Sequence, residues 1–242
     1  SADPAVATAY GQALALSGRG EEAARVSVQH AAAVANGGRG TVPLRDTLRA
    51  EVLALSRTAA ANFQRGEAKL RAGDFQGSAR ELERALGVDP KNRVARLMLA
   101  KARIGLRDPG AARAVLQNLL DENASDPDAH AMLGQLDAEV GEFERAIEHI
   151  ATATRTAPID GLTWRAWVTA LGALQRWEEA LFRIDEWKLA IPAAAEPFFL
   201  EALARKNAGQ AEDAAAALEE ASRRAPTHPM RREIEALLRG NR

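Results

Sequence analysis

The chain of 242 residues contains no cysteine, which excludes disulfide bonds, thiolate nucleophiles and cysteine-bound metals. Aromatic residues make up only 5% of the sequence, and much of the 47% hydrophobic share is alanine. A net charge of −1 gives no overall field that would attract nucleic acid or an anionic membrane. No apolar run reaches the roughly eighteen residues that a membrane-spanning helix needs. We therefore expect no nucleic-acid partner and no membrane insertion of this chain.

Patterns that carry catalysis are also missing from the sequence. There is no glycine-rich phosphate loop, no G-x-S-x-G turn and no H-E-x-x-H helix. Adjacent carboxylates such as Glu178 and Glu179 diverge on a helix, so they cannot share an acid–base task. We therefore expect no enzymatic activity, no catalytic residue and no cofactor.

Histidine offers the only hint of a metal site. His130 and His149 fall on two helices of one predicted helix pair, and Asp128 is close in sequence. A third close ligand is not evident, and a protein zinc site needs at least three. We interpret these histidines as partly exposed surface residues and expect no metal.

What the sequence does contain is a repeated unit of thirty-four residues, which is clearest at 127–160. Gly134 and Ala146 are small enough to let two helices approach closely. Gly141 permits the positive φ that often ends a first helix, and Pro158 stops the second helix. The unit is therefore predicted to be a pair of short helices packed against each other.

Four further copies keep this phase, at 59–92, 93–126, 161–194 and 195–228. The copy at 93–126 is the weakest, because Ala124 stands where the others carry proline. Residues that cap helix N-termini fall thirty-four apart, at Asn92, Asp126 and Asp160. Chance similarity would not keep the same thirty-four-residue spacing over five successive copies, so the repeat is real.

The period and the glycine–aromatic–alanine–proline order resemble the tetratricopeptide repeat (TPR) family. This resemblance covers residues 59–228 and implies an all-α fold, a right-handed α-solenoid of helix-turn-helix repeats. The segment 229–242 then reads as a capping helix with apolar residues toward the last repeat. Residues 1–40 read as a degenerate repeat-like helix pair followed by a glycine-rich loop.

Residues 41–58 interrupt the repeat phase as an insertion. Apolar residues at helical spacing run from Leu44 to Leu70 without a proline, which predicts one long helix capped at Thr41. A helix break near Thr58 is the competing interpretation, because Thr58 lies thirty-four residues before Asn92.

Tryptophan is concentrated in the repeat 161–194, where a ligand pocket and core packing are both possible readings. Trp164 and Trp177 occupy positions that pack in the other repeats, so we favour core packing for the cluster. Trp167 and Phe199 do not fall as clearly on positions that pack in the other repeats. A binding role therefore stays open for these two residues.

In the TPR family the first helix of each repeat builds a concave groove. Transferring that phase places Gln135, Glu139, Leu162 and Thr169, among others, on the groove face. The residues most strongly expected to contact a partner are Phe63, Leu70, Leu97, Met98, Lys101, Met132, Arg165, Phe199 and Leu203. The lysine and asparagine cluster with which some family members hold a C-terminal carboxylate is missing here. A groove that mixes phenylalanine, leucine and methionine with scattered charges instead suits an apolar or amphipathic peptide or helix as partner.

These features favour a non-catalytic scaffold or adaptor for protein–protein interaction. Its composition suggests a bacterium with a GC-rich genome, and the resemblance implies assembly of an envelope-associated complex. Two alternatives stay open: a regulatory or substrate-presenting part of a larger enzyme, and a self-assembling structural module. The oligomeric state is not predicted.

The compartment is also left open by the sequence. The chain begins at Ser1 without methionine, which fits removal of a signal peptide as well as a piece of a longer protein. Lack of cysteine is compatible with both cytoplasm and periplasm, of which we slightly favour the periplasm.

Overall fold

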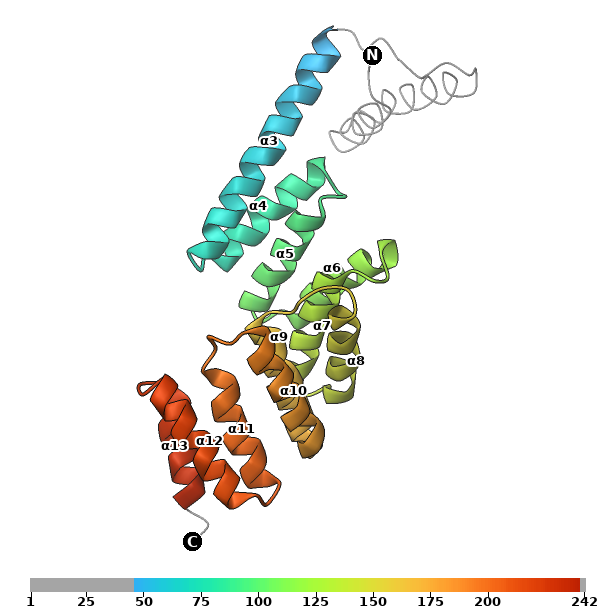
Figure 1. Cartoon of the computed structure of the whole chain (residues 1–242). Coiled ribbons are helices and arrows are strands. Elements are labelled where there is room, and N and C mark those ends of the chain that lie inside the picture. The colour runs from blue at the N-terminus through green and yellow to red at the C-terminus, as the bar shows by residue number, and fades with distance from the viewer. Residues whose placement is uncertain (1–45, 240–242) are drawn as a thin grey trace. The chain divides into compact units, whose positions relative to one another are not determined.

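The computed structural model describes residues 46–239, and this part of the chain consists of helices joined by short turns (Figure 1). The helices are α3 (Asp46–Arg71), α4 (Phe75–Val88), α5 (Arg93–Gly105), α6 (Pro109–Glu122), α7 (Pro127–Val140), α8 (Phe143–Thr154), α9 (Gly161–Ala173), α10 (Trp177–Ala190), α11 (Glu196–Asn207), α12 (Ala211–Arg224) and α13 (Pro229–Arg239). The expected all-α class is confirmed. None of these helices is both long and apolar enough to cross a lipid bilayer.

The chain forms two compact units, divided between Val115 and Leu116 within α6. The expected helix pair and loop at 1–40, and the expected N-cap at Thr41, lie outside the described residues, as do 240–242. In the first unit α3 packs on α4, and α4 on α5. In the second unit α7 packs on α8, α9 on α10 and α11 on α12.

Helix α3 runs without interruption through Thr58. The Thr58 hydroxyl donates a hydrogen bond to the carbonyl of Ala54, 2.8 Å away and one turn earlier in the same helix. A threonine that bonds back in this way lies inside a helix, whereas an N-cap accepts from the N–H groups that follow it. The 26 residues of α3 thus form a single helix.

Side-chain caps start three helices at the positions that the repeat phase predicted. Asn92, Asp126 and Asp160 each accept a hydrogen bond from a backbone N–H three residues later. Asp74 caps α4 in the same manner, and the N–H of Gly77, with help from Lys69, holds the pKa of the Asp74 carboxyl below its ordinary value. These oxygens satisfy N–H groups that the helix itself leaves unbonded.

The turn between the helices of each pair repeats one backbone conformation. Gly73, Arg107, Gly141, Gln175 and Gly209 all have φ between 57° and 85° and follow one another at intervals of thirty-four residues. Glycine takes this left-handed conformation without strain, but a residue with a Cβ does not. Two of the five turns are therefore strained by their side chains.

Replacing Gln175 with glycine is expected to stabilise the second unit by about 0.5–1 kcal/mol, because relief of left-handed strain exceeds the entropy that glycine costs. Urea denaturation measured by circular dichroism tests the change. The reverse substitution Gly141→Gln is the matched comparison, and it should destabilise. Equal or lower stability of Gln175→Gly would show that the turn carries no strain.

Close helix contact within pairs depends on a glycine in the first helix, where a side chain would collide with the second helix. A Cβ on Gly134 of α7 would lie 2.4 Å from Cγ1 of Ile150 and 3.1 Å from the carbonyl oxygen of Ala146, both on α8. In the first unit a Cβ on Gly66 would lie 2.7 Å from Cγ of Leu82. The Ser78 hydroxyl adds a buried 2.8 Å hydrogen bond to the Gly66 carbonyl.

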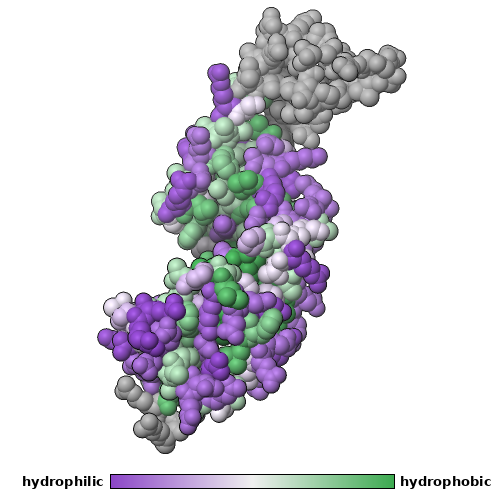
Figure 2. Space-filling view, in the orientation of Figure 1, coloured by the Kyte–Doolittle hydropathy of each residue, from purple (hydrophilic) through white to green (hydrophobic). Residues whose placement is uncertain are grey.

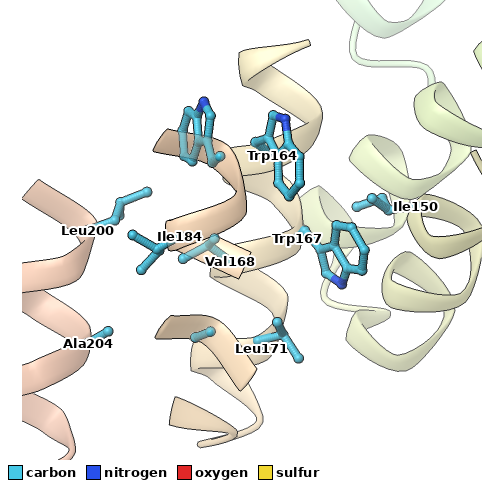
Figure 3. Packing of buried hydrophobic residues seen from close by; sticks show 10 residues of the cluster. Ile150, Trp164, Trp167, Val168, Leu171, Ile184, Leu200 and Ala204 are labelled. Carbon is cyan, nitrogen blue, oxygen red and sulfur yellow. The ribbon is translucent and has the colours of Figure 1, made fainter. Parts of the chain in front are cut away.

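The core of the second unit is built around the tryptophans of α9 and α10. Trp164, Trp167 and Trp187 are buried with Ile184, and Ile150 of α8 and Leu200 of α11 complete the cluster. Figure 3 shows the Trp167 ring directed toward Ile150, with Leu200 and Ala204 on the opposite side of α9 and α10. Core packing of the tryptophan cluster is therefore confirmed, including Trp167.

Helix α13 covers the last helix pair. Ile234 is buried against a cluster that includes Phe199 of α11 and Ala221 of α12. The exposed face of α13 carries charged residues such as Arg232 and Glu233. This division into an apolar and a charged face is what an end of a repeat array needs in order to stay in contact with water.

Candidate functional site

The first helices of two successive pairs, α7 and α9, pack side by side and form a hollow of about 340 Å³. Residues from α7 line one wall and residues from α9 the other. The lining residues are Gln135, Ala138, Glu139, Leu162, Arg165, Ala166 and Thr169. We call this hollow the α7–α9 groove.

Hydrogen bonds fix the spacing of the two walls. The Gln135 amide of α7 donates to the Thr163 hydroxyl of α9 at 2.6 Å. That hydroxyl in turn donates to the Asp160 carboxylate at 2.7 Å, and Asp160 caps α9. Because each group is held by the next, the groove exists before any partner arrives and costs little to organise on binding.

An ion pair holds the Arg165 side chain at the α11 end of the groove. Nε of Arg165 lies 3.1 Å from Oε1 of Glu196, the first residue of α11. About half of the Arg165 side chain stays exposed, so its guanidinium can still meet a partner. Exposed pairs of this kind contribute little to stability, which leaves their arrangement free to serve recognition.

Leu162 is the apolar feature of the groove, with 56% of its surface exposed. The neighbouring Ala138 and Ala166 extend this apolar surface, and the Glu139 carboxylate lies at its edge. On the face seen in Figure 2 hydrophobic residues occur as small areas among many hydrophilic ones. An exposed leucine inside a hollow is therefore a candidate contact for a partner.

The groove includes several residues that the repeat phase assigned to it. Gln135, Glu139, Leu162, Arg165 and Thr169 all line the hollow, and Arg165 belongs to the set most strongly expected to bind a partner. Ala138 and Ala166 were missed. Alanine is also common between the packed helices of the described residues. An alanine in the sequence therefore does not indicate whether the position lines a groove or is buried in the core.

Other expected partner contacts in the second unit are packing residues. Phe199 is completely buried, with its ring stacked on His228 at 4.6 Å between centroids. Met132 is buried, and Leu203 is half-buried against the cluster of α11, α12 and α13. The expectation that Phe199 and Met132 face a partner is therefore corrected: helix packing covers both side chains.

The expected contacts in the first unit lie on or against that unit's own core. Phe63, Leu70 and Met98 are half-buried against a cluster that contains Leu82 and Leu99. Leu97 is buried, which corrects its expected role as an exposed contact, and Lys101 is exposed. The structure thus places these residues on a unit separate from the α7–α9 groove.

The two histidines of the 127–160 pair do meet. Nδ1 of His130 lies 2.9 Å from Nδ1 of His149, and Nε2 of His130 lies 3.0 Å from the Ala124 carbonyl oxygen. A carbonyl only accepts, so Nε2 of His130 carries a proton and Nδ1 of a neutral His130 accepts from His149. His130 is buried, in contrast to the expected exposure. Between residues 46 and 239 no group of three histidine or carboxylate side chains is arranged so that it could hold a metal ion.

Comparisons with known proteins agree with this arrangement of helix pairs. A family model described as tetratricopeptide repeat matches residues 69–136 and, in an overlapping match, 103–166. The crystal structure of MamA has a TM-score of 0.60 and 19% identity, covering 69% of this chain and 91% of that chain. MamA from Desulfovibrio magneticus RS-1 has a TM-score of 0.63 and 13% identity, covering 71% and 97%.

A chain of the APC/C hetero-tetramer Cut9–Hcn1 is similar as well, with a TM-score of 0.64 and 16% identity over 74% of this chain and 36% of that chain. The chain has no significant match among curated proteins. At these identities the structural likeness describes the fold alone, while the family match describes the repeats. Residues 69–166 therefore consist of tetratricopeptide repeats.

Proposed function

We propose that the chain is a non-catalytic scaffold that holds an apolar or amphipathic segment of a partner protein in the α7–α9 groove. The observation that carries this proposal is the exposed Leu162 in a hollow whose walls are fixed by hydrogen bonds. Burying an exposed leucine contributes about 1.5–3 kcal/mol, so it can anchor a small interface.

The groove's polar groups fit a helix or extended segment with one polar side. The Glu139 carboxylate and the Arg165 guanidinium lie at the edge of the apolar surface, one from each wall. A partner segment can place its apolar residues on Leu162 and its charged residues toward these two groups. The paired charges would fix register and orientation more than they add affinity.

The fold supports the same function, since a repeat solenoid presents long surfaces assembled from successive helices. One similar structure, Cut9–Hcn1 of the APC/C, is a hetero-tetramer. We further propose that the partner belongs to a bacterial envelope-associated complex, which rests on the composition and family resemblance of the sequence. Partner identification tests this finer statement.

Leu162→Asp is expected to reduce partner capture about tenfold or more, because the new carboxylate would lose its water against the apolar side of the partner segment. The tagged chain and the variant are incubated with lysate of the source organism, and retained proteins are quantified by mass spectrometry. Leu237→Asp is the matched control, since Leu237 is also exposed but lies on α13.

Equal loss in both variants would indicate general damage, and circular dichroism of each would reveal it. A partner that is retained equally by the wild type and by folded Leu162→Asp would exclude the groove as its site. Loss confined to Leu162→Asp would support it.

A further inference from the structure

A second hollow, of about 610 Å³, lies where the turn after α8 meets α9 and α10. It is separate from the α7–α9 groove, with which it shares no lining residue. Trp164 and Trp167 of α9 contribute aromatic surface, Arg183 and Glu186 of α10 contribute charge, and Ile159 and Ile191 contribute aliphatic surface.

The hollow already holds a guanidinium group of the chain itself. The guanidinium carbon of Arg183 lies 4.3 Å from the ring centroid of Trp167, within cation–π distance. Nη1 of the same group lies 2.5 Å from the Glu186 carboxylate. An aromatic face and a carboxylate that converge on one planar cation are the two contacts that arginine recognition uses.

The polar part of the wall accepts hydrogen bonds and has no hydroxyl proton to offer. The hydroxyls of Thr154 and Thr156 donate to the carbonyls of Ala151 and Ala153 in α8, at 2.9 and 3.3 Å. Each hydroxyl oxygen therefore keeps lone pairs that can accept a hydrogen bond. With the Glu186 carboxylate, this wall matches a ligand that carries several N–H donors.

Arg183 also has another aromatic group within reach. The Phe182 ring is 59% exposed, and its centroid lies 5.0 Å from the Arg183 guanidinium carbon. A rotation of the side chain toward Phe182 would keep a cation–π contact while freeing Trp167 and Glu186. Displacement of Arg183 therefore costs less than its present contacts suggest.

We propose that this hollow is a binding site for an arginine side chain of a partner protein, and that Arg183 occupies it until the partner's arginine displaces Arg183 toward Phe182. The aliphatic stem of the incoming arginine would lie along Ile159 and Ile191. Arginine is favoured over lysine because its planar group stacks on an indole and pairs with a carboxylate in two places.

The probe for this site is N-acetyl-arginine methylamide, and the neutral probe of nearly the same shape is N-acetyl-citrulline methylamide. The Nε1–H signals of the four tryptophans are followed by ¹H–¹⁵N NMR as each probe is added. We expect the arginine probe to shift the Trp167 and Trp164 signals saturably and to leave Trp177 unchanged. The citrulline probe should cause no saturable shift.

Two variants separate the resident cation from the binding groups. Arg183→Ala should bind the arginine probe about two- to fivefold more tightly, because the guanidinium of Arg183 no longer competes with the probe for the site. The competition is modest, since a cation–π contact at an exposed site is weak. Glu186→Gln should bind it at least about threefold more weakly, because a charged acceptor is lost. The pair Arg176 and Glu179, with the same spacing at the N-terminal end of α10, provides control variants that should leave affinity unchanged.

Equal shifts with both probes, or no saturable shift, would overturn the proposal. Weaker binding by Arg183→Ala would also overturn it, since Arg183 would then be part of the site and no placeholder. The Trp187 signal and far-ultraviolet circular dichroism report folding of each variant. The groove variant Leu162→Asp should bind the arginine probe normally, which keeps this test independent of the proposed function.

Discussion

Trp187→Ala is expected to lower the free energy of unfolding of the second unit by about 3–5 kcal/mol, the usual loss when a buried tryptophan is truncated. Only 1% of Trp187 is exposed, and it packs in the cluster that joins α9, α10 and α11. Truncation would leave a cavity in contact with Trp164 and Leu200, and the rigid helix pairs can collapse only partly to fill it.

Urea denaturation followed by circular dichroism measures this loss. Leu189→Ala is the matched control, because Leu189 lies two residues further along α10 and is 82% exposed. Its substitution should change stability by no more than about 0.5 kcal/mol. A loss below about 1 kcal/mol for Trp187→Ala would show that the cluster is far looser than the structure indicates.

Gly134→Ala is the second large expected effect, with a loss of about 1–3 kcal/mol from overpacking. The new methyl group would meet both the Ile150 side chain and the Ala146 carbonyl. Ile150 can change its rotamer, but the carbonyl belongs to the α8 backbone, so the helices have to separate. Ala146→Leu tests the same contact from α8 and should destabilise by a similar amount, about 1–3 kcal/mol.

Gly87→Ala is the internal control for this substitution. Gly87 lies in α4, and a Cβ there would meet no atom within 4 Å. Alanine is a better helix former than glycine, so this variant should gain up to about 1 kcal/mol. Thermal melting of both variants gives the comparison, and similar Tm changes would argue against a steric origin of the Gly134 effect.

Local features of the fold could be predicted from the sequence because each depends on a few neighbouring residues. Asp126 and Asp160 cap helices through N–H groups three residues away, and Gly141 adopts a backbone conformation that its lack of a Cβ permits. The strained turn at Gln175 follows from the same period, since it lies thirty-four residues from Gly141.

Burial that depends on a distant helix could not be predicted. Phe199 has the repeat phase of a groove residue, but α13 covers it from thirty residues further along the chain. His130 has the sequence of a surface histidine, but contacts to His149 and to the Ala124 carbonyl bury it. The position of a residue within the repeat predicts the direction in which its side chain leaves the helix. Which other helix covers that side chain depends on the packing of the whole unit.

The contact of Ile234 with Phe199 links the fluctuations of two helices at the C-terminal end. Whenever α13 detaches, the buried ring of Phe199 meets water, so α11 loses packing in the same event. Amide protons of α11 and α13 should therefore exchange with solvent through a shared opening, as one cooperative segment. In that transient state Phe199 becomes an exposed aromatic residue beside α12.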